Sequence, residues 1–205
     1  MGICCSIYPL ASQQLAQLRA DPPLVWRLLE PEDAQPYLSE LARLQKVSWR
    51  QRLQRLQLPW RPQGRSRAPA TPAVPVPDLP APALGMLDLD KSWDGLRHCI
   101  GRCAPDAPDF FAGDGAIGRI EVGYGPALAV DSGTLARYAA ALQGIDEGSL
   151  LRQLQGSDFK EVYLGELWRR RDADSQAYLL ENFRDLHGFM RQAAAQGLAA
   201  VICYS

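Results

Sequence analysis

A dense group of side chains that could perform acid–base chemistry lies between residues 87 and 100. Asp88, Asp90 and Asp94 flank Trp93 in this stretch. Two carboxylates beside an aromatic wall can hydrolyse a glycosidic bond when they face each other across the substrate. Glu161 could approach Asp94 from the predicted sheet, so a small hydrolase that uses these two carboxylates in a pocket is an alternative function.

The two histidines lack neighbours suited to nucleophilic catalysis. His98 adjoins Cys99, but consecutive helix residues point about 100° apart, so a Cys–His dyad is geometrically poor there. Cys99 and Cys103 can share a helix face, yet a structural zinc needs two further ligands, and the other cysteines fall on predicted strands. The sequence therefore predicts no catalytic residue, no metal site and no cofactor.

Nucleotide and nucleic-acid binding also receive little support from the sequence. Residues 113–118 spell G-x-G-x-x-G, but this run precedes a predicted strand and opens no helix, so the context of a dinucleotide site is missing. Residues 41–77 carry eight basic side chains and no acid, whereas the rest of the chain holds 14 basic against 23 acidic residues, a net charge of −9. The basic segment could neutralise phosphates. An acidic body argues against this, and we predict no nucleic-acid partner.

Composition favours a soluble protein in a reducing compartment. The five cysteines are odd in number and show no CxxC pair, so no disulfide framework is predicted. No apolar run reaches the roughly 18–20 residues that span a bilayer, and no secretory signal is visible. We expect a cytoplasmic protein without a membrane span.

The N-terminal residues permit two interpretations. Met1 to Ser6 fit the M-G-x-x-x-[ST] pattern for myristoylation of Gly2, with Cys4 and Cys5 as neighbouring palmitoylation sites. The same residues begin an apolar run that is typical of a buried strand, in which free cysteine is common. We favour the strand.

Hydrophobic periodicity predicts an α+β fold with a mostly antiparallel sheet packed against amphipathic helices. The expected strands cover residues 3–8, 117–122, 127–130 and 198–204. The first is closed by Pro9, and the last is apolar enough to be a central strand covered on both faces. Predicted helices begin near Ser12, Pro22, Pro36, Asp90, Asp131, Glu147 and Asp174.

Two of these helices bear on the position of functional residues. A helix capped by Asp90 and running to about Arg102 would place Trp93, Leu96 and Ile100 on one buried face. A basic amphipathic helix is expected over residues 36–58. Residues 59–82 contain eight of the sixteen prolines, so we interpret residues 45–85 as a basic, proline-rich insertion within a single domain of residues 1–205.

The order of three motifs resembles the YfbM-like family, catalogued as domain of unknown function 1877. These are Leu87-Asp-Leu-Asp-Lys-Ser-Trp-Asp-Gly-Leu96, Gly123-Tyr-Gly-Pro126 and Glu161-Val-Tyr163, followed by the final helix and strand. The resemblance covers residues 1–30 and 86–205, and it implies a small α+β domain, mainly bacterial, without an established activity. Arg97 stands where the family usually has a histidine, and Leu128 where it often has an arginine.

The absence of a catalytic constellation and the acidic body together favour a non-enzymatic module that binds a basic protein. An immunity or antitoxin-type inhibitor of a bacterial toxin is the concrete form of this hypothesis. The oligomeric state is left open. The candidate binding residues are an acid-rimmed aromatic group and its predicted neighbours: Asp88, Asp90, Trp93, Asp94, Tyr124, Glu161 and Tyr163.

Overall fold

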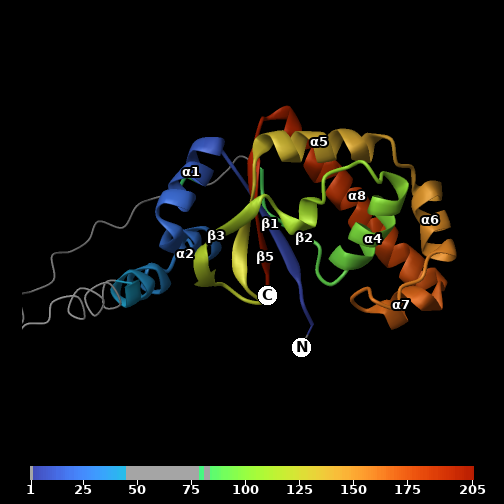
Figure 1. Ribbon diagram of the computed structural model, residues 1–205, viewed down its shortest axis with the longest axis horizontal. Coiled ribbons are helices and arrows are strands. Elements are labelled where there is room, and N and C mark those ends of the chain that lie inside the picture. The colour runs from blue at the N-terminus through green and yellow to red at the C-terminus, as the bar shows by residue number, and fades with distance from the viewer. Residues whose placement is uncertain (1, 45–78, 81–83) are drawn as a thin grey trace, which may run out of the picture. The chain divides into compact units, whose positions relative to one another are not determined.

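The computed structural model describes residues 2–44, 79–80 and 84–205, which are coloured in Figure 1. The chain divides into two compact units, Met1–Pro22 with Ala81–Ser205 and Pro23–Pro80. In the second unit, α2 (Val25–Leu29) is followed by a helical stretch over residues 35–44. Most of the predicted insertion and the rest of the basic helix lie outside the described residues, so both stay predictions.

The first unit is built on a five-stranded antiparallel sheet. Its strands are β1 (Cys5–Leu10), β2 (Leu87–Asp88), β3 (Gly115–Glu121), β4 (Pro126–Val130) and β5 (Ala199–Tyr204), in the order β2-β1-β5-β4-β3. Every neighbouring pair is antiparallel. The predicted α+β fold is therefore confirmed. Only β2 has no counterpart among the expected strands, because two residues are too few to show an alternating pattern.

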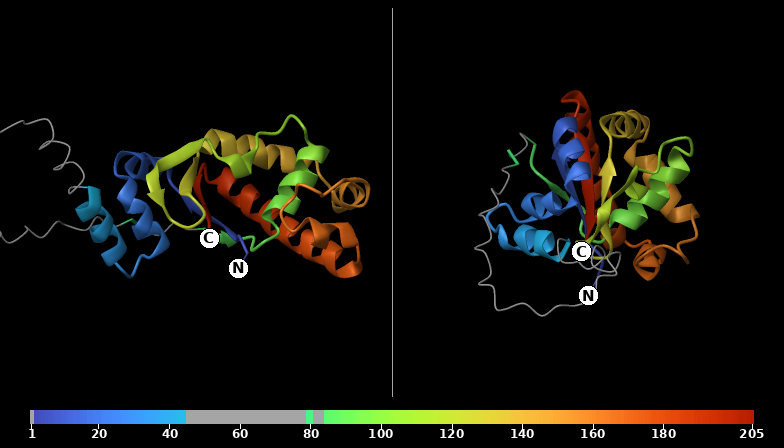
Figure 2. Two further views of the ribbon diagram at one scale, coloured as in Figure 1. Left: turned by 60° about the horizontal axis from the view of Figure 1, so that its bottom comes forward. Right: turned by 60° about the vertical axis from the view of Figure 1, so that its left-hand side comes forward.

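The last strand is the centre of the sheet, as its apolar sequence predicted. Residues 199–203 are all buried. Ala200 and Ile202 belong to the large core together with Cys5 and Ile7 of β1. The opposite face is approached by α1 (Ser12–Ala20), which contacts β3 and β5. Both views in Figure 2 show helices on the two sides of the sheet.

Most helices pack on the large core. They are α4 (Trp93–Cys103), α5 (Ser132–Gln143), α6 (Glu147–Gly156), α7 (Gly165–Arg170) and α8 (Ala173–Ala195), with a short 3₁₀ turn at Phe110–Ala112 between α4 and β3. Asp172 caps α8 by accepting a hydrogen bond from the Ser175 N–H at 2.9 Å. Gly197 has φ of 63°, as expected for a residue just past a helix C-terminus. The short α7 was not predicted.

The first strand continues through Pro9 to Leu10, so the prediction that Pro9 closes it was wrong. Cys5 exchanges hydrogen bonds with Leu89 and Asp90, so Cys5, Ile7 and Pro9 direct their backbone polar groups toward β2. β2 pairs only with Ser6 and Ile7. The missing N–H of Pro9 therefore points beyond the end of β2, where none of the described strands would accept it.

Asp90 is not the cap of α4, which corrects a second prediction. The helix begins at Trp93, and Ser92 occupies the N-cap position. Asp90 precedes it with φ of 45°, in the left-handed region that aspartate tolerates better than most residues. Its carboxylate accepts hydrogen bonds from the Tyr178 hydroxyl at 2.8 Å and the Cys4 thiol at 3.3 Å. Asp90 thus ties the loop after β2 to α8 and to the N-terminal segment.

These hydrogen bonds predict an acid-sensitive contribution to stability. Burial by itself raises the pKa of Asp90, but the bonds from Tyr178 and Cys4 outweigh it and lower the pKa below 3.8. A carboxyl group with a lowered folded pKa stabilises the protein above pH 3.8, and this stability is lost as the pH falls further. We expect Asp90→Asn to make the loss of unfolding free energy below that pH shallower, as measured by denaturant titrations.

Tyr178→Phe provides the matched test of the same effect. It removes one of the two hydrogen bonds and keeps the carboxylate, so its acid-induced loss should fall between those of the wild type and Asp90→Asn. Identical slopes for all three proteins would show that Asp90 does not carry this pH dependence.

The structure shows whether the thiol of Cys5, a candidate palmitoylation site, is accessible. Cys5 is fully buried in β1, and burial together with neighbouring acidic groups raises the pKa of its thiol. Its sulfur is therefore shielded from acylation in the folded protein.

Among the helices that the structure describes, none has the length and apolar character needed to cross a membrane.

Candidate functional site

Trp93 holds the N-terminal segment against α4. Its indole N–H donates to the Ile3 carbonyl at 3.0 Å. Its ring lies 6.1 Å from that of Tyr163, in a stacked arrangement, and 4.7 Å from that of Tyr204. The side chain is half-buried. The polar and aromatic groups of Trp93 are thus used within the fold.

Tyr163 connects three separate parts of the chain. Its hydroxyl accepts the Ile3 N–H at 2.7 Å, and its backbone N–H donates to Asp94 Oδ2 at 2.7 Å. Its carbonyl accepts the indole N–H of Trp168 at 2.9 Å. The turn before α7 is therefore fastened to the first turn of α4, which places Lys160 and Glu161 beside that helix.

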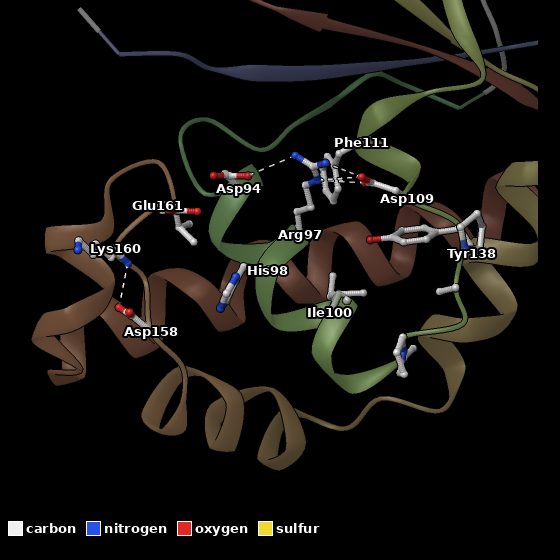
Figure 3. Close-up of a pocket in the computed structure, with 16 residues that line it drawn as sticks. Asp94, Arg97, His98, Ile100, Asp109, Phe111, Tyr138, Asp158, Lys160 and Glu161 are labelled. Carbon is white, nitrogen blue, oxygen red and sulfur yellow. Dashed lines mark hydrogen bonds and ion pairs between the residues drawn. The ribbon is translucent and has the colours of Figure 1, made fainter.

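A cleft of about 570 Å³ lies between α4, the segment 104–111 and the turn 158–162 (Figure 3). Its apolar lining residues include Ile100, Phe111 and Val162. Its charged lining residues are Asp94, Arg97, Asp109, Asp158, Lys160 and Glu161. The volume falls within the range of small-ligand sites.

Arg97 is the centre of an ion cluster on one wall of the cleft. Its Nε lies 3.1 Å from each carboxylate oxygen of Asp109, and its Nη1 lies 3.8 Å from Asp94 Oδ1. The hydrogen bonds to Asp109 raise the pKa of Arg97, so it stays charged. Both partners are 44% exposed, so the pair adds little to stability. It does hold the segment 104–111 against α4.

The opposite wall carries the turn 158–162. Asp158 stabilises the turn by accepting the Lys160 N–H at 3.0 Å, and Asp158, Lys160 and Glu161 are all exposed. Four carboxylates and two basic side chains line the cleft, a net charge of −2. Burial lowers the pKa of His98, so this imidazole adds no positive charge at neutral pH.

Two polar atoms in residues of the cleft wall lack a hydrogen-bond partner among the described residues. They are the hydroxyl oxygen of Tyr138 and Nε2 of His98. Tyr138 is 3% exposed and stacks on Phe110 with ring centres 5.0 Å apart. The His98 ring packs on Phe159 at 4.8 Å. A buried polar group without a partner costs about 1–3 kcal/mol, so native proteins rarely leave one unpaired.

The structure brings together only some of the candidate residues. Asp94 and Glu161 line the same cleft. Asp88 lies in β2 and Asp90 in the following loop, and neither lines the cleft. Tyr124 is 56% exposed on the β3–β4 turn, where its backbone N–H donates to the Tyr204 carbonyl.

Sequence reasoning did not identify most of the residues that shape the cleft. Arg97 was noted only as a departure from a family pattern. Tyr138 lies on the inner face of α5, where periodicity predicts a core residue and cannot show that its hydroxyl lacks a partner. Asp109 follows a Pro-Asp-Ala-Pro run that offers no signal of its pairing.

Cysteine chemistry receives no support from the geometry. Cys99 is fully buried, and burial raises the pKa of its thiol to about 12, so it behaves as a small apolar side chain. Burial also raises the pKa of Cys203 to about 12. In the part of the chain that the structure describes, no three His, Cys, Asp or Glu side chains are grouped closely enough to hold a metal ion.

The sheet order, the helices on the core face and the cleft beside α4 define an α+β domain with an open antiparallel sheet. The chain belongs to the family described as "Domain of unknown function (DUF1877)", whose model matches residues 1–203. The resemblance inferred from the sequence is thereby confirmed.

A solved structure supports the same fold. The crystal structure of YfbM from Escherichia coli, a protein of unknown function, aligns with a TM-score of 0.52 and 16% sequence identity over 98% of this chain and 99% of that one. No curated protein matches the sequence.

Proposed function

We propose that this protein is a binding module that receives a basic side chain of a protein partner in the cleft beside α4. The observation that carries the proposal is the composition of the cleft. Carboxylates from α4, from the segment 104–111 and from the turn 158–162 line the cleft together with apolar side chains, and its net charge is −2. A lysine or arginine side chain matches this combination, since its apolar stem covers hydrophobic surface while its charged head reaches the acids.

The charge of the remaining surface supports a basic partner. Outside residues 41–77 the chain has a net charge of −9. Complementary charge accelerates encounter and discriminates among partners without any chemical step. Asp88 and Asp90 are exposed on the same folded unit and would add to this long-range attraction. Among the exposed carboxylates of the cleft, we assign Glu161 to direct contact with the partner.

An immunity or antitoxin-type inhibitor of a basic toxin is one form of such a binding protein. Its distinguishing feature is a stoichiometric complex with a single basic protein, and a toxin encoded by the neighbouring gene would be the natural partner to test.

The alternative function, a hydrolase that uses Asp94 and Glu161, is favoured by one observation, since both side chains do line the same cleft. Asp94, however, is engaged by the Tyr163 N–H and lies near Arg97. A general acid or nucleophile needs a carboxyl group that is free to reach substrate. We therefore rank Asp94 as a positioning residue. Hydrolysis of a nitrophenyl ester or glycoside panel that disappears in Glu161→Gln would reverse this ranking.

The binding hypothesis predicts a charge-dependent affinity for basic peptides. We expect short arginine- or lysine-containing peptides to bind in isothermal titration calorimetry, glutamate-containing peptides not to bind, and added salt to weaken the interaction. The double variant Asp158→Asn/Glu161→Gln should lower the affinity roughly three- to tenfold, because exposed ion pairs contribute up to about 1 kcal/mol each.

Glu181→Gln/Asp185→Asn is the matched control. It removes the same charge from exposed positions on α8, which do not line the cleft. Its affinity should stay close to that of the wild type at high salt. Equal losses in both double variants, or no binding of any basic peptide, would contradict the proposed function.

A further inference from the structure

One carboxylate of the cleft is already bound to a basic side chain, and that side chain belongs to the protein itself. Arg97 donates from Nε to both oxygens of Asp109, at 3.1 Å each, and from Nη2 to Oδ2. Two neighbouring nitrogens on one carboxylate form the fork in which arginine generally binds such groups. In the free protein, Asp109 therefore holds the kind of group that the cleft is proposed to receive.

The ion pair between Arg97 and Asp109 can open easily. Each of the two side chains is 44% exposed. Exposed ion pairs are weak, so a pair of this kind is open in roughly 15–40% of molecules at equilibrium. In the described part of the chain, the Asp109 carboxylate accepts hydrogen bonds from Arg97 alone. A cation from outside therefore needs to displace only this one group.

When the pair opens, Arg97 is the partner that can leave. Asp109 is followed directly by Phe110 and Phe111, which are 0% and 2% exposed and anchor this part of the chain in the core. Phe110 also stacks on Tyr138 of α5. Arg97, in contrast, lies on an exposed position of α4 and has a long side chain with many rotamers. The carboxylate thus stays at the cleft while the guanidinium moves.

A second carboxylate is within reach of the displaced guanidinium. Nη1 of Arg97 lies 3.8 Å from Oδ1 of Asp94, which precedes it by three positions on α4, and Figure 3 shows Arg97 between the two aspartates. Residues three apart are neighbours on a helix surface. The other oxygen of Asp94 accepts the Tyr163 N–H, so Oδ1 can receive Arg97. Arg97 can therefore exchange one carboxylate for another without losing its compensating charge.

We propose that Asp109 is a docking point for a basic side chain of the partner, and that Arg97 competes with the partner for it. The proposal rests on the proposed function and adds Asp109 to the contacts with the partner. When the partner's basic side chain binds Asp109, Arg97 turns to Asp94. Because Asp109 is occupied in most free molecules, Arg97 lowers the apparent affinity by the fraction that is open. It thereby rejects cations that bind Asp109 no better than it does.

Arg97→Gln tests the competition, with Lys160→Gln as the matched control. Each variant removes one positive charge from the cleft lining. The Lys160 ammonium forms no ion pair with a described residue, so its removal uncovers no carboxylate. Affinities are measured by NMR titration with a terminally blocked tripeptide that has a central arginine. We expect Arg97→Gln to bind this peptide roughly two- to fivefold more tightly than Lys160→Gln does.

Two further measurements separate competition from a general change in charge. Asp109→Asn should weaken binding, and in this background Arg97→Gln should gain no more than Lys160→Gln does, since no carboxylate is left to uncover. The Nε–H signal of Arg97 reports the exchange directly in the wild type. It should shift as the peptide saturates the protein, because Nε loses its bond to Asp109, and it should shift in the same direction in Asp109→Asn without peptide.

Each contrary result has a defined meaning. Peptide binding to the wild type without a change in the Arg97 Nε–H signal would overturn the competition and leave the binding function standing. Equal affinities of Arg97→Gln and Lys160→Gln would do the same. Failure of the wild type and of all variants to bind the peptide would overturn both proposals together. The wild-type signal does not depend on the folding of any variant, so it decides the matter even if Arg97→Gln is unstable.

Discussion

Replacing Trp168 with alanine is expected to lower the free energy of unfolding by about 3–5 kcal/mol, the usual cost of truncating a large buried aromatic side chain. Trp168 is 0% exposed and is the largest fully buried side chain among the residues that the structure describes. Its ring stacks on Tyr178 at 5.9 Å, with an angle of 8° between the planes. Its indole N–H donates to the Tyr163 carbonyl. The alanine substitution would leave a cavity and would also leave the Tyr163 carbonyl without this hydrogen bond.

The position of Trp168 explains why the damage should reach the cleft. α7 has six residues, too few for a helix that is stable without tertiary contacts, and Trp168 is its buried residue. Loss of this anchor should loosen the turn 158–162. We expect chemical denaturation to report the loss of stability and amide hydrogen exchange to report faster opening of this turn. Trp168→Phe, which refills most of the cavity, should recover more than half of the stability. A loss below about 1 kcal/mol in Trp168→Ala would contradict this account.

Replacing Gly95 with alanine should also destabilise the protein, although alanine is the better helix former. A Cβ atom at this position would lie 2.5 Å from Cε2 and 2.6 Å from Cζ2 of Trp168. The indole is fully buried and hydrogen-bonded, so neither partner can move freely. Overpacking of this kind costs about 1–3 kcal/mol, and the helix propensity of alanine returns up to about 1 kcal/mol. We expect a net loss of up to about 2 kcal/mol in denaturant titrations.

Gly101→Ala, in the same helix, should have the opposite sign. Gly101 is exposed, and a Cβ there would meet no atom within 4 Å. The substitution should therefore stabilise the protein by about 0.5–1 kcal/mol, the difference in helix propensity. Stabilisation by both substitutions would show that α4 and Trp168 are less closely packed than the structure indicates.

The two residues also account for the arrangement of the cleft. Gly95 lets Trp168 approach the first turn of α4, and Trp168 in turn holds the Tyr163 carbonyl. Asp94, next to Gly95, binds the backbone N–H of the same tyrosine. The two walls of the cleft are thus joined through one small group of contacts behind it.

Local patterns predicted the regular elements well. The apolar run at 198–204 and the helix predicted to begin near Asp174 each agree with the structure within a few residues. Such patterns reflect burial along a single element, which the residue types report directly. The predictions for Pro9 and Asp90 were wrong because contacts with a neighbouring element, and not the local sequence, determine the conformation there. Pro9 fits within β1 because β2 ends before it, and Asp90 bonds to Tyr178 instead of capping α4.

The sequence alone determined the class of fold, the membership of a family and the acidic character of the body, because composition, periodicity and short motifs carry that information. Only the tertiary structure decided the site. Asp94 and Tyr163 are 69 positions apart and meet through a backbone N–H that no residue type reveals. The unpaired hydroxyl of Tyr138 is invisible to periodicity, which distinguishes buried from exposed positions but does not show whether a buried polar atom has found a partner.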